Sequence, residues 1–326
     1  MMANAKTACN CAAGTNETIG TLLFYSEFDS PDEWRQVIKD ALPELDFRVY
    51  PDVGDPADVK YILAWKPYDG FFSAFSNLSL VINLGAGVDS LLQRTDLPQV
   101  PIARLSDSGM VQLMKSYVLF AVLRYARDIP AFEAAKRAKN WTYIHPRPLH
   151  RIKVGVIGLG QLGGAVAAAL SQLSFDVRGW DASPKTIDGV KITDGMALSH
   201  FTKDLDICVN MLPLTPQTTG LLDAAFFNAL PSGSHFINAS RGAVVDERAL
   251  LAALKSGHVA GATLDAFCVE PLPEDHPFWE MDNVLITPHL ASITVPETAA
   301  IDVVDNIRRI NRGEMPKHQV SFAKGF

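Results

Sequence analysis

Short apolar runs alternate with amphipathic stretches from Gly20 onward, and this alternation predicts the architecture of the first part of the chain. Four of the runs have the length and the β-branched and aromatic content of strands. Between the first two runs, Pro31–Ala41 is expected to form a helix, with Ser30 as its N-cap before a proline at the first helical position. A strand–helix–strand order is typical of a parallel sheet. The expected strands are Thr21–Tyr25, Phe47–Tyr50, Tyr61–Trp65 and Leu80–Leu84.

The same alternation restarts after a polar, proline-bearing stretch at Asn140–Arg151. Before that stretch, Gly109–Arg127 is long, amphipathic and without internal glycine or proline, which predicts a helix. After it, helices such as Glu247–Ser256 separate most of the apolar runs, and Pro296–Arg312 is expected to be a terminal helix. We therefore expect an α/β fold of two doubly wound parallel-sheet units, the second starting near Lys153. The expected strands of the second unit are Val154–Ile157, Val177–Trp180, Ile207–Asn210, His235–Asn238, Ala262–Asp265 and Val284–Ile286.

One uncharged run, Val154–Phe175, has 22 residues and is long enough to cross a membrane as a helix. Five glycines crowd its first half, and the sequence changes character after Gly163. The first part, KVGVIG, predicts a short buried strand, and the second part, AVAAALSQL, predicts a helix. A strand–turn–helix explains the glycines, so no membrane partner is expected.

Composition narrows the class of protein. A length of 326 residues suggests two domains, and 48 % hydrophobic residues against 20 % charged residues predict packed cores. The net charge of −7 argues against a nucleic-acid partner. The four cysteines match neither a disulfide framework nor a zinc site, so we expect reduced thiols, no metal and a cytoplasmic location, with Cys208 and Cys268 in the core. Residues 1–18 have no apolar segment typical of a signal peptide and are expected to form a disordered extension.

A glycine-rich hexapeptide, GLGQLG at Gly158–Gly163, lies between the expected strand and helix. In a dinucleotide site Gly158 allows the tight turn, Gly160 lets a pyrophosphate approach the backbone, and Gly163 lets the helix pack on the sheet. The helix N-terminus then offers free N–H groups to the phosphates. Asp181 lies 18 residues beyond Gly163, at a strand end where a carboxylate can bind ribose hydroxyls. The hexapeptide alone could be a simple turn, but this context predicts a dinucleotide site.

Three strand ends of the second unit carry the groups needed to reduce a 2-keto acid. A guanidinium, Arg241, suits a carboxylate, and an imidazole, His289, suits proton donation to a ketone oxygen. A carboxylate, Glu270, suits the role of fixing that imidazole. Taken singly, each has an ordinary alternative: a cation at a helix start, a structural or surface histidine, and a loop acid in water. Their joint position beyond the strands of one dinucleotide unit favours the catalytic interpretation.

With these motifs in place, the sequence resembles the D-isomer-specific 2-hydroxyacid dehydrogenase family, and within it most closely the glyoxylate/hydroxypyruvate reductase A group. The resemblance covers nearly the whole chain from Gly20. Besides the hexapeptide, the supporting motifs are NLGAGVDS (Asn83–Ser90), ARLSDSGM (Ala103–Met110), NMLPLTPQT (Asn210–Thr218), NASRG (Asn238–Gly242), LDAFCVEPLP (Leu264–Pro273) and TPHLAS (Thr287–Ser292).

The resemblance implies roles for individual residues. Arg241 would bind the substrate carboxylate and keto oxygen, His289 would be the general acid, and Glu270 its partner. Ala86 and Gly87 would clamp the carboxylate through their amides, and Trp65 would form a pocket wall. Trp141 would reach the partner's active site or simply anchor a dimer interface. The implied cofactor contacts are Gly158, Gly160, Gln161, Leu162, Gly163, Asp181, Leu212, Pro213, Thr215, Thr218, Ala239 and Asp265.

The resemblance also implies a homodimer of two Rossmann- or flavodoxin-like domains with a cleft between them. The substrate domain would comprise residues 19–105 plus 290–326, and the dinucleotide-binding domain residues 106–289. The implied reaction is reduction of a small 2-keto acid, glyoxylate or hydroxypyruvate, to the D-2-hydroxy acid. Two alternatives stay open. One is a related enzyme that oxidises D-lactate or 3-phosphoglycerate, and the other is a non-catalytic NAD-sensing protein similar to the corepressors of this fold.

The expected cofactor is NAD(H). Many relatives have an arginine beside the position of Asp181, which suits the 2′-phosphate of NADP, whereas Asp181 should repel that phosphate. Arg178 and Lys185 could still hold a phosphate, so NADP(H) stays open.

Overall fold

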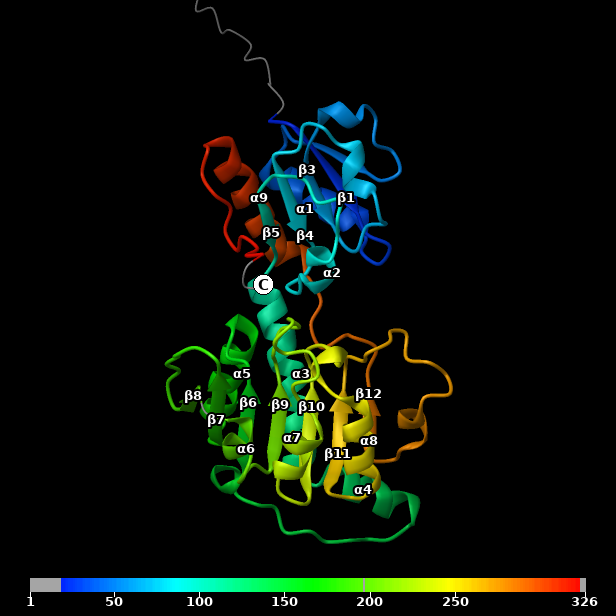
Figure 1. The fold of residues 1–326 in the computed structure, drawn as a ribbon, viewed down its shortest axis with the longest axis vertical. Helices are drawn as coiled ribbons and strands as arrows, with labels where there is room; N and C mark the ends of the chain where they lie inside the picture. The colour runs from blue at the N-terminus through cyan, green and yellow to red at the C-terminus, as the bar shows by residue number, and fades with distance from the viewer. Residues whose placement is uncertain (1–18, 196, 323–326) are drawn as a thin grey trace, which may run out of the picture.

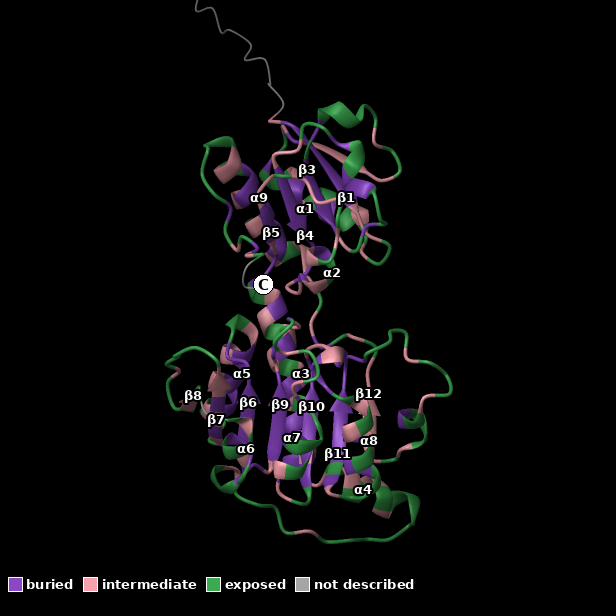
Figure 2. Cartoon of the chain, viewed as in Figure 1, coloured by how far each residue is buried: buried purple, intermediate pink, exposed green. Residues whose placement is uncertain are grey.

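The computed structural model describes residues 19–195 and 197–322, which form two units that each contain one parallel sheet (Figure 1). The two-unit, parallel α/β fold predicted from the sequence is confirmed. The extension predicted at residues 1–18 lies outside the described residues. The strands of both sheets are largely buried between helices, as Figure 2 shows.

The first sheet has the order β2-β1-β3-β4-β5, and all its pairs are parallel. Four strands match the expected runs, but β5 was not predicted, because its three residues, IAR, include a single large apolar side chain. Helix α9, at the end of the chain, packs into this first core through Val303 and Ile307, beside Trp34 of α1. The strands are β1 (Thr21–Tyr25), β2 (Asp46–Val49), β3 (Val59–Ala64), β4 (Leu80–Asn83) and β5 (Ile102–Arg104), with helices α1 (Pro31–Ala41), α2 (Asp89–Leu92) and α9 (Pro296–Asn311).

The second sheet has seven parallel strands in the order β12-β11-β10-β9-β6-β7-β8. The strand order reverses between β6 and β9, which is where sheets of this type bind ligands. The sequence analysis missed the edge strand β8, whose sequence KITD holds a single apolar residue. The strands are β6 (Lys153–Ile157), β7 (Asp176–Asp181), β8 (Lys191–Asp194), β9 (Ile207–Asn210), β10 (Ser234–Asn238), β11 (Val259–Leu264) and β12 (Val284–Ile286).

Helices cover both faces of this second sheet. Helices α3 and α5 pack on one face, and α7 and α8 pack on the other. The α-helices of the second unit are α3 (Ser108–Ala126), α4 (Ile129–Arg137), α5 (Gln161–Gln172), α6 (Leu198–Phe201), α7 (Ala224–Ala229) and α8 (Glu247–Lys255). Short 3-10 helices are η1 (Pro56–Asp58), η2 (Phe71–Ala74), η3 (Leu149–Arg151), η4 (Gly242–Val244) and η5 (Pro277–Glu280).

Several local predictions can be compared with the structure. The run Val154–Phe175 forms β6, a turn and α5, as predicted, and none of the described helices is long and apolar enough to span a membrane. Ser30 stands at the N-cap of α1, but its side chain makes no capping hydrogen bond. Cys208 is buried as expected, whereas the prediction for Cys268 is wrong, because it follows its strand end into an exposed loop.

The two units are joined at a narrow waist where the chain crosses twice, before α3 and before α9 (Figure 1). Ser106 and Gln161 exchange two hydrogen bonds there, each of 2.8 Å, one between the side chains and one from the Gln161 amide to the Ser106 carbonyl. Ser292 donates to the Met110 carbonyl at 2.8 Å, which ties the second crossing to the first. The glycine-rich turn is therefore linked directly to the waist.

Candidate active site

The carboxyl ends of the central strands of the second sheet face the first unit (Figure 1). Each residue group predicted from a strand end therefore opens toward the same side. The loop after β4 enters this space from the opposite unit, because Gly87 contacts the side chain of Arg241.

The glycine-rich turn has the geometry that a dinucleotide requires. Gly158 has φ +91°, which a residue with a side chain rarely adopts. A Cβ on Gly163 would lie 1.9 Å from the Gly158 carbonyl oxygen, so only glycine lets α5 pack this closely. Gly160 faces open space, and α5 begins after it without a side-chain cap. The free N–H groups and the open approach at Gly160 fit a pyrophosphate.

Asp181 lies at the end of β7, and its carboxylate is tied to this turn. It accepts hydrogen bonds from the Leu159 amide at 2.8 Å and from the Ser183 amide and hydroxyl at 3.0 and 2.8 Å. Burial opposes ionisation, but these hydrogen bonds outweigh it and, with Lys185 nearby, lower the pKa of Asp181. Arg178 instead pairs with Asp204 near the amino-terminal edge of the sheet, so Lys185 is the cation that remains near Asp181.

The three predicted catalytic side chains meet at one point. Nδ1 of His289 lies 2.8 and 3.0 Å from the two Glu270 carboxylate oxygens. Nε2 of His289 lies 3.5 Å from Nη1 of Arg241. Burial opposes ionisation of Glu270, but the hydrogen bonds from His289 and the Phe267 amide, together with the charge of Lys66, lower the pKa of Glu270. An ionised carboxylate only accepts, so Nδ1 carries the proton and Nε2 faces Arg241.

One residue outside the catalytic trio, Asp265, holds the segment that carries His289. Asp265 is 2 % exposed and accepts from the Thr287 hydroxyl at 2.6 Å and from the Leu290 and Ala291 amides at 2.8 Å. These bonds hold the segment that carries His289, which has φ +58°. Asp265 was predicted from the sequence to lie at the cofactor, and its support of the His289 segment was not predicted.

Arg241 is held by both units. Its Nη1 donates to the Ser240 carbonyl at 3.0 Å, and its Nε donates to Asp89 at 3.0 Å. Beneath it, the buried Asn238 donates to the Arg241 carbonyl at 3.3 Å. Sequence reasoning missed Asp89, although it lies within the NLGAGVDS motif; its pairing with Arg241 has no local signal.

The loop after β4 lies beside Arg241 and contains two backbone amides without a partner among the described residues. Asn83 donates to the carbonyls of Gly85 and Gly87, each at 2.9 Å, which turns these carbonyls toward Asn83. Within the described part of the chain, the amides of Ala86 and Gly87 have no hydrogen-bond acceptor. The ring of Trp65 packs against Gly85, so Trp65 lies beside the same loop.

The other predicted residues lie in three different surroundings. Leu212, Thr215 and Ala239 are buried in the loops after β9 and β10, at the carboxyl edge of the second sheet. Thr218 accepts from the Thr215 amide at 2.8 Å and donates to the Pro213 carbonyl at 2.6 Å, which shapes the first of these loops. Leu162 packs partly buried against the core beneath α5.

Two predicted residues play other parts in this chain. The Gln161 side chain bonds the waist rather than facing the glycine-rich turn. Trp141 is 99 % exposed in the segment after α4, so the single chain does not bring it to the site.

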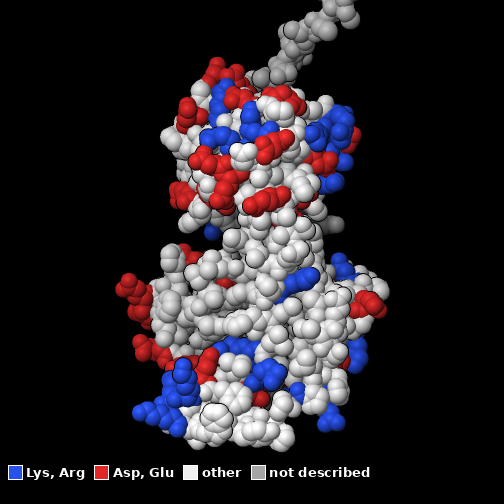
Figure 3. Space-filling model, turned by 180° about the vertical axis from the view of Figure 1, so that it is seen from behind, with Lys and Arg blue, Asp and Glu red and all other residues white. Residues whose placement is uncertain are grey.

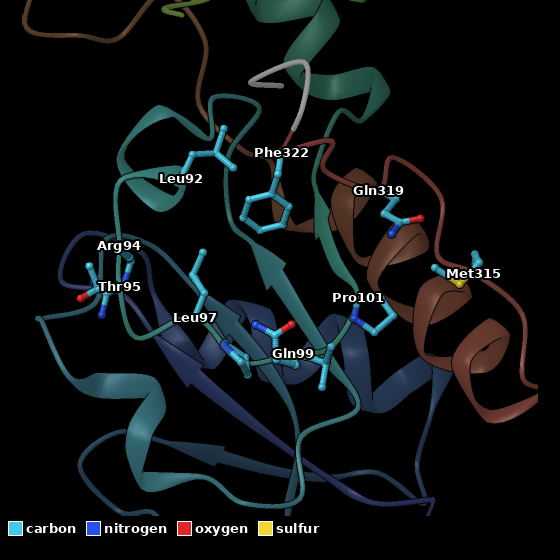
Figure 4. Close-up of a pocket in the computed structure, with 11 residues that line it drawn as sticks. Leu92, Arg94, Thr95, Leu97, Gln99, Pro101, Met315, Gln319 and Phe322 are labelled. Atoms are coloured by element: carbon cyan, nitrogen blue, oxygen red, sulfur yellow. The ribbon is translucent and has the colours of Figure 1, made fainter. Parts of the chain in front are cut away.

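A separate hollow of 540 Å³ lies on the first unit, between the loop before β5 and the end of the described chain (Figure 4). Apolar side chains such as Leu97, Met315 and Phe322 line it. Its one charged lining residue, Arg94, already binds Asp96 and the carbonyls of Pro67 and Tyr68. The hollow therefore offers no group for the expected chemistry. Among the described residues, moreover, no cluster of three or more His, Cys, Asp or Glu side chains could hold a metal.

Comparison with known proteins identifies relatives that share nearly the whole chain. Residues 119–291 match the model for the NAD-binding domain of D-isomer specific 2-hydroxyacid dehydrogenases. The glyoxylate/hydroxypyruvate reductase A proteins of Yersinia enterocolitica and Serratia proteamaculans are 38 % and 37 % identical over 94 % of this chain and 99 % of their own.

Solved structures of the same family also resemble this chain. A D-isomer specific 2-hydroxyacid dehydrogenase from Xanthobacter autotrophicus in complex with NADPH and MES is 54 % identical, with a TM-score of 0.92 over 94 % of this chain and 99 % of that one. An NADPH-dependent glyoxylate/hydroxypyruvate reductase from Sinorhizobium meliloti, in complex with NADP and sulfate, is 32 % identical with a TM-score of 0.89, over 94 % of this chain and 100 % of that one.

Proposed function

This chain belongs to the family of D-isomer-specific 2-hydroxyacid dehydrogenases. From that premise we propose that it reduces a small 2-keto acid, either hydroxypyruvate to the D-2-hydroxy acid or glyoxylate to glycolate, which is achiral. The observation that carries the proposal is the meeting of Arg241, His289 and Glu270 at the same edge of the sheet as the glycine-rich turn. The names of the relatives support glyoxylate and hydroxypyruvate as the first substrates to test.

The substrate would bind on the outer edge of the Arg241 guanidinium. Nη2 would hold a carboxylate oxygen, with the free amides of Ala86 and Gly87 on its other side. Nη1 would hold the keto oxygen, which then also lies within hydrogen-bond reach of Nε2 of His289, because the two nitrogens are 3.5 Å apart. One site thus orients the acid and polarises its carbonyl.

The residues around the turn would hold a nicotinamide dinucleotide, with its diphosphate at the start of α5 and its ribose near Asp181. When bound, the cofactor supplies the hydride for the keto carbon. His289 would give the proton on Nε2 to the keto oxygen while Nδ1 stays bonded to Glu270. The Glu270 carboxylate stabilises the charged imidazole before the transfer and fixes its orientation.

The first experiment is initial-rate oxidation of NADH and NADPH by the purified protein with glyoxylate, hydroxypyruvate and pyruvate, together with the reverse reaction of D-lactate and 3-phosphoglycerate. We expect turnover with glyoxylate or hydroxypyruvate. In His289→Ala we expect kcat to fall by at least about 1,000-fold, which is on the order of the rate enhancement that general acid–base catalysis supplies. Tight cofactor binding without turnover of any acid would instead favour a non-catalytic dinucleotide sensor.

For the cofactor, we propose that the chain accepts both NADH and NADPH. The ionised Asp181 favours the free ribose of NADH, as the sequence analysis expected, while Lys185 can hold a 2′-phosphate. The NADPH and NADP in the related structures support the second use. We expect kcat/KM values for the two cofactors within about tenfold, and a shift toward NADPH in Asp181→Asn. A preference above about 100-fold for either cofactor would contradict this balance.

We further propose a cytoplasmic homodimer. Trp141 and Tyr143 are 99 % and 77 % exposed in the segment after α4, and Phe120 is exposed on α3. The face of the second unit that bears α3 carries a broad surface with few charges (Figure 3). Covering these side chains with a second copy removes apolar area from water. Light scattering should give twice the monomer mass, with weaker association in Trp141→Ala than in the control Leu173→Ala, and cell fractionation tests the location.

A further inference from the structure

Asp89 reaches the substrate-binding guanidinium from the opposite unit. It is the first residue of α2, and one of its carboxylate oxygens accepts the Nε hydrogen of Arg241 at 3.0 Å. The two residues are 152 positions apart, and their side chains are 24 % and 23 % exposed. The contact is therefore a partly screened ion pair between the two units.

The remaining contacts of Arg241 show what this pair does. A guanidinium offers an anion two edges, one formed by Nε with an Nη and the other by the two Nη groups. Asp89 occupies the first edge. The Ser240 carbonyl accepts a hydrogen bond from Nη1 at 3.0 Å, and the backbone of Gly87 lies against Nη2. The outer edge, which faces His289, is left for the substrate.

We propose that Asp89 is a positioning residue that forces a 2-keto acid onto the outer edge of Arg241, with its keto oxygen next to Nε2 of His289. Without Asp89, the edge that includes Nε becomes equally attractive to the substrate carboxylate, and an acid bound there has its carbonyl away from the imidazole. The proposal rests on the proposed function, since it concerns the same site.

The charge of Asp89 gives the proposal a distinctive signature. A carboxylate next to Arg241 weakens the attraction of the site for an anion, so a residue kept for affinity would not be acidic. Removing Asp89 should therefore leave the acid bound as tightly or more tightly while turnover falls. Loss of an interaction that acts on orientation lowers kcat without raising KM.

The test compares Asp89→Ala, Asp89→Asn and the wild type with hydroxypyruvate or glyoxylate and a saturating cofactor. We expect Asp89→Ala to lower kcat about 10- to 100-fold, because a displacement of about 1 Å can cost about 100-fold, with KM unchanged or lower. Asp89→Asn keeps an acceptor for Nε and should retain kcat within about threefold, with KM reduced by up to about fivefold. Asp69→Ala, which removes an exposed carboxylate of the same unit, is the control.

Calorimetry with oxamate, a planar analogue that accepts no hydride, supplies a second readout. We expect its Kd in Asp89→Ala to stay equal or fall by up to about fivefold. A kcat unchanged in Asp89→Ala, a tenfold weaker oxamate Kd, or a rise in kcat/KM would each overturn the proposal; the last would mean that Asp89 competes with the substrate. If the wild type reduces no 2-keto acid, the proposed function fails, and the oxamate measurement still tests whether Asp89 weakens anion binding at Arg241.

Discussion

Replacing Gly87 by alanine should impair the chemistry at Arg241 while leaving the stability of the fold largely intact. The added Cβ would lie 1.6 Å from Nη2 and 2.7 Å from Cζ of Arg241, where ordinary contact begins at 3.4 Å. The guanidinium must therefore move by nearly 2 Å, or the two units must separate by a similar distance. Asp89 and Ser240 hold the guanidinium in its present plane, so either movement displaces the groups that bind the substrate.

We expect this displacement to lower kcat/KM for hydroxypyruvate or glyoxylate at least about 100-fold, equivalent to about 2.7 kcal/mol of transition-state stabilisation. The melting temperature should fall by only a few degrees, because Gly87 lies in a half-exposed loop between the units rather than in either core. Initial rates and thermal unfolding are measured on the same preparations, with Ser90→Ala as the control for a change in the neighbouring exposed side chain. A kcat/KM within twofold of the wild type would refute the inferred contact.

Three further predictions concern Glu270 and the core of the first unit. Glu270→Gln should lower kcat, measured by stopped-flow turnover, about 10- to 100-fold. Cofactor affinity, measured by fluorescence titration, should not change. An equal loss of kcat and of cofactor affinity would contradict a role of Glu270 confined to His289. Because its contacts lower the pKa of Glu270 below 4.5, its carboxylate adds stability above that pH which is lost as the pH falls through the lowered folded value. The difference in melting temperature between wild type and Glu270→Gln should therefore shrink from pH 7 to pH 3.5, and a constant difference would contradict this origin. Ile307→Ala, in the fully buried face of α9, should destabilise the first unit by about 2–4 kcal/mol in urea unfolding, whereas the exposed Ile301→Ala on the same helix should cost less than about 0.5 kcal/mol.

Much of the fold could be predicted from the sequence, because the local periodicity of apolar residues indicates most of the helices and strands. The helix at Pro31–Ala41 and the strands at Thr21–Tyr25, Ile207–Asn210 and Val284–Ile286 match the expected bounds. Each is a run whose apolar residues suffice to show what must be buried. Strands β5 and β8 were not predicted, because their sequences, IAR and KITD, each hold a single large apolar residue, whereas the equally short Val284–Ile286 is apolar throughout.

The site likewise has a part that could be predicted from the sequence and a part that could not. The turn at Gly158–Gly163 is visible because its glycines satisfy local backbone demands, and Arg241, Glu270 and His289 are visible because parallel strands end at one edge. The supports of these residues are not visible. The bonds from the Asp265 carboxylate to the His289 segment and from Gln161 to the waist join elements far apart in the chain.

By itself, therefore, the sequence determined the two parallel sheets, the turn that suits a dinucleotide and the side chains available at the strand ends. Only the tertiary structure decided how those side chains are aimed. Asp89 meets Arg241 because the two units dock across the waist, and Nε2 of His289 faces the guanidinium because Glu270 holds the opposite nitrogen. Hydrophobic periodicity records burial within an element, whereas a contact between residues 152 positions apart depends on how whole units pack, for which a single sequence carries no local pattern.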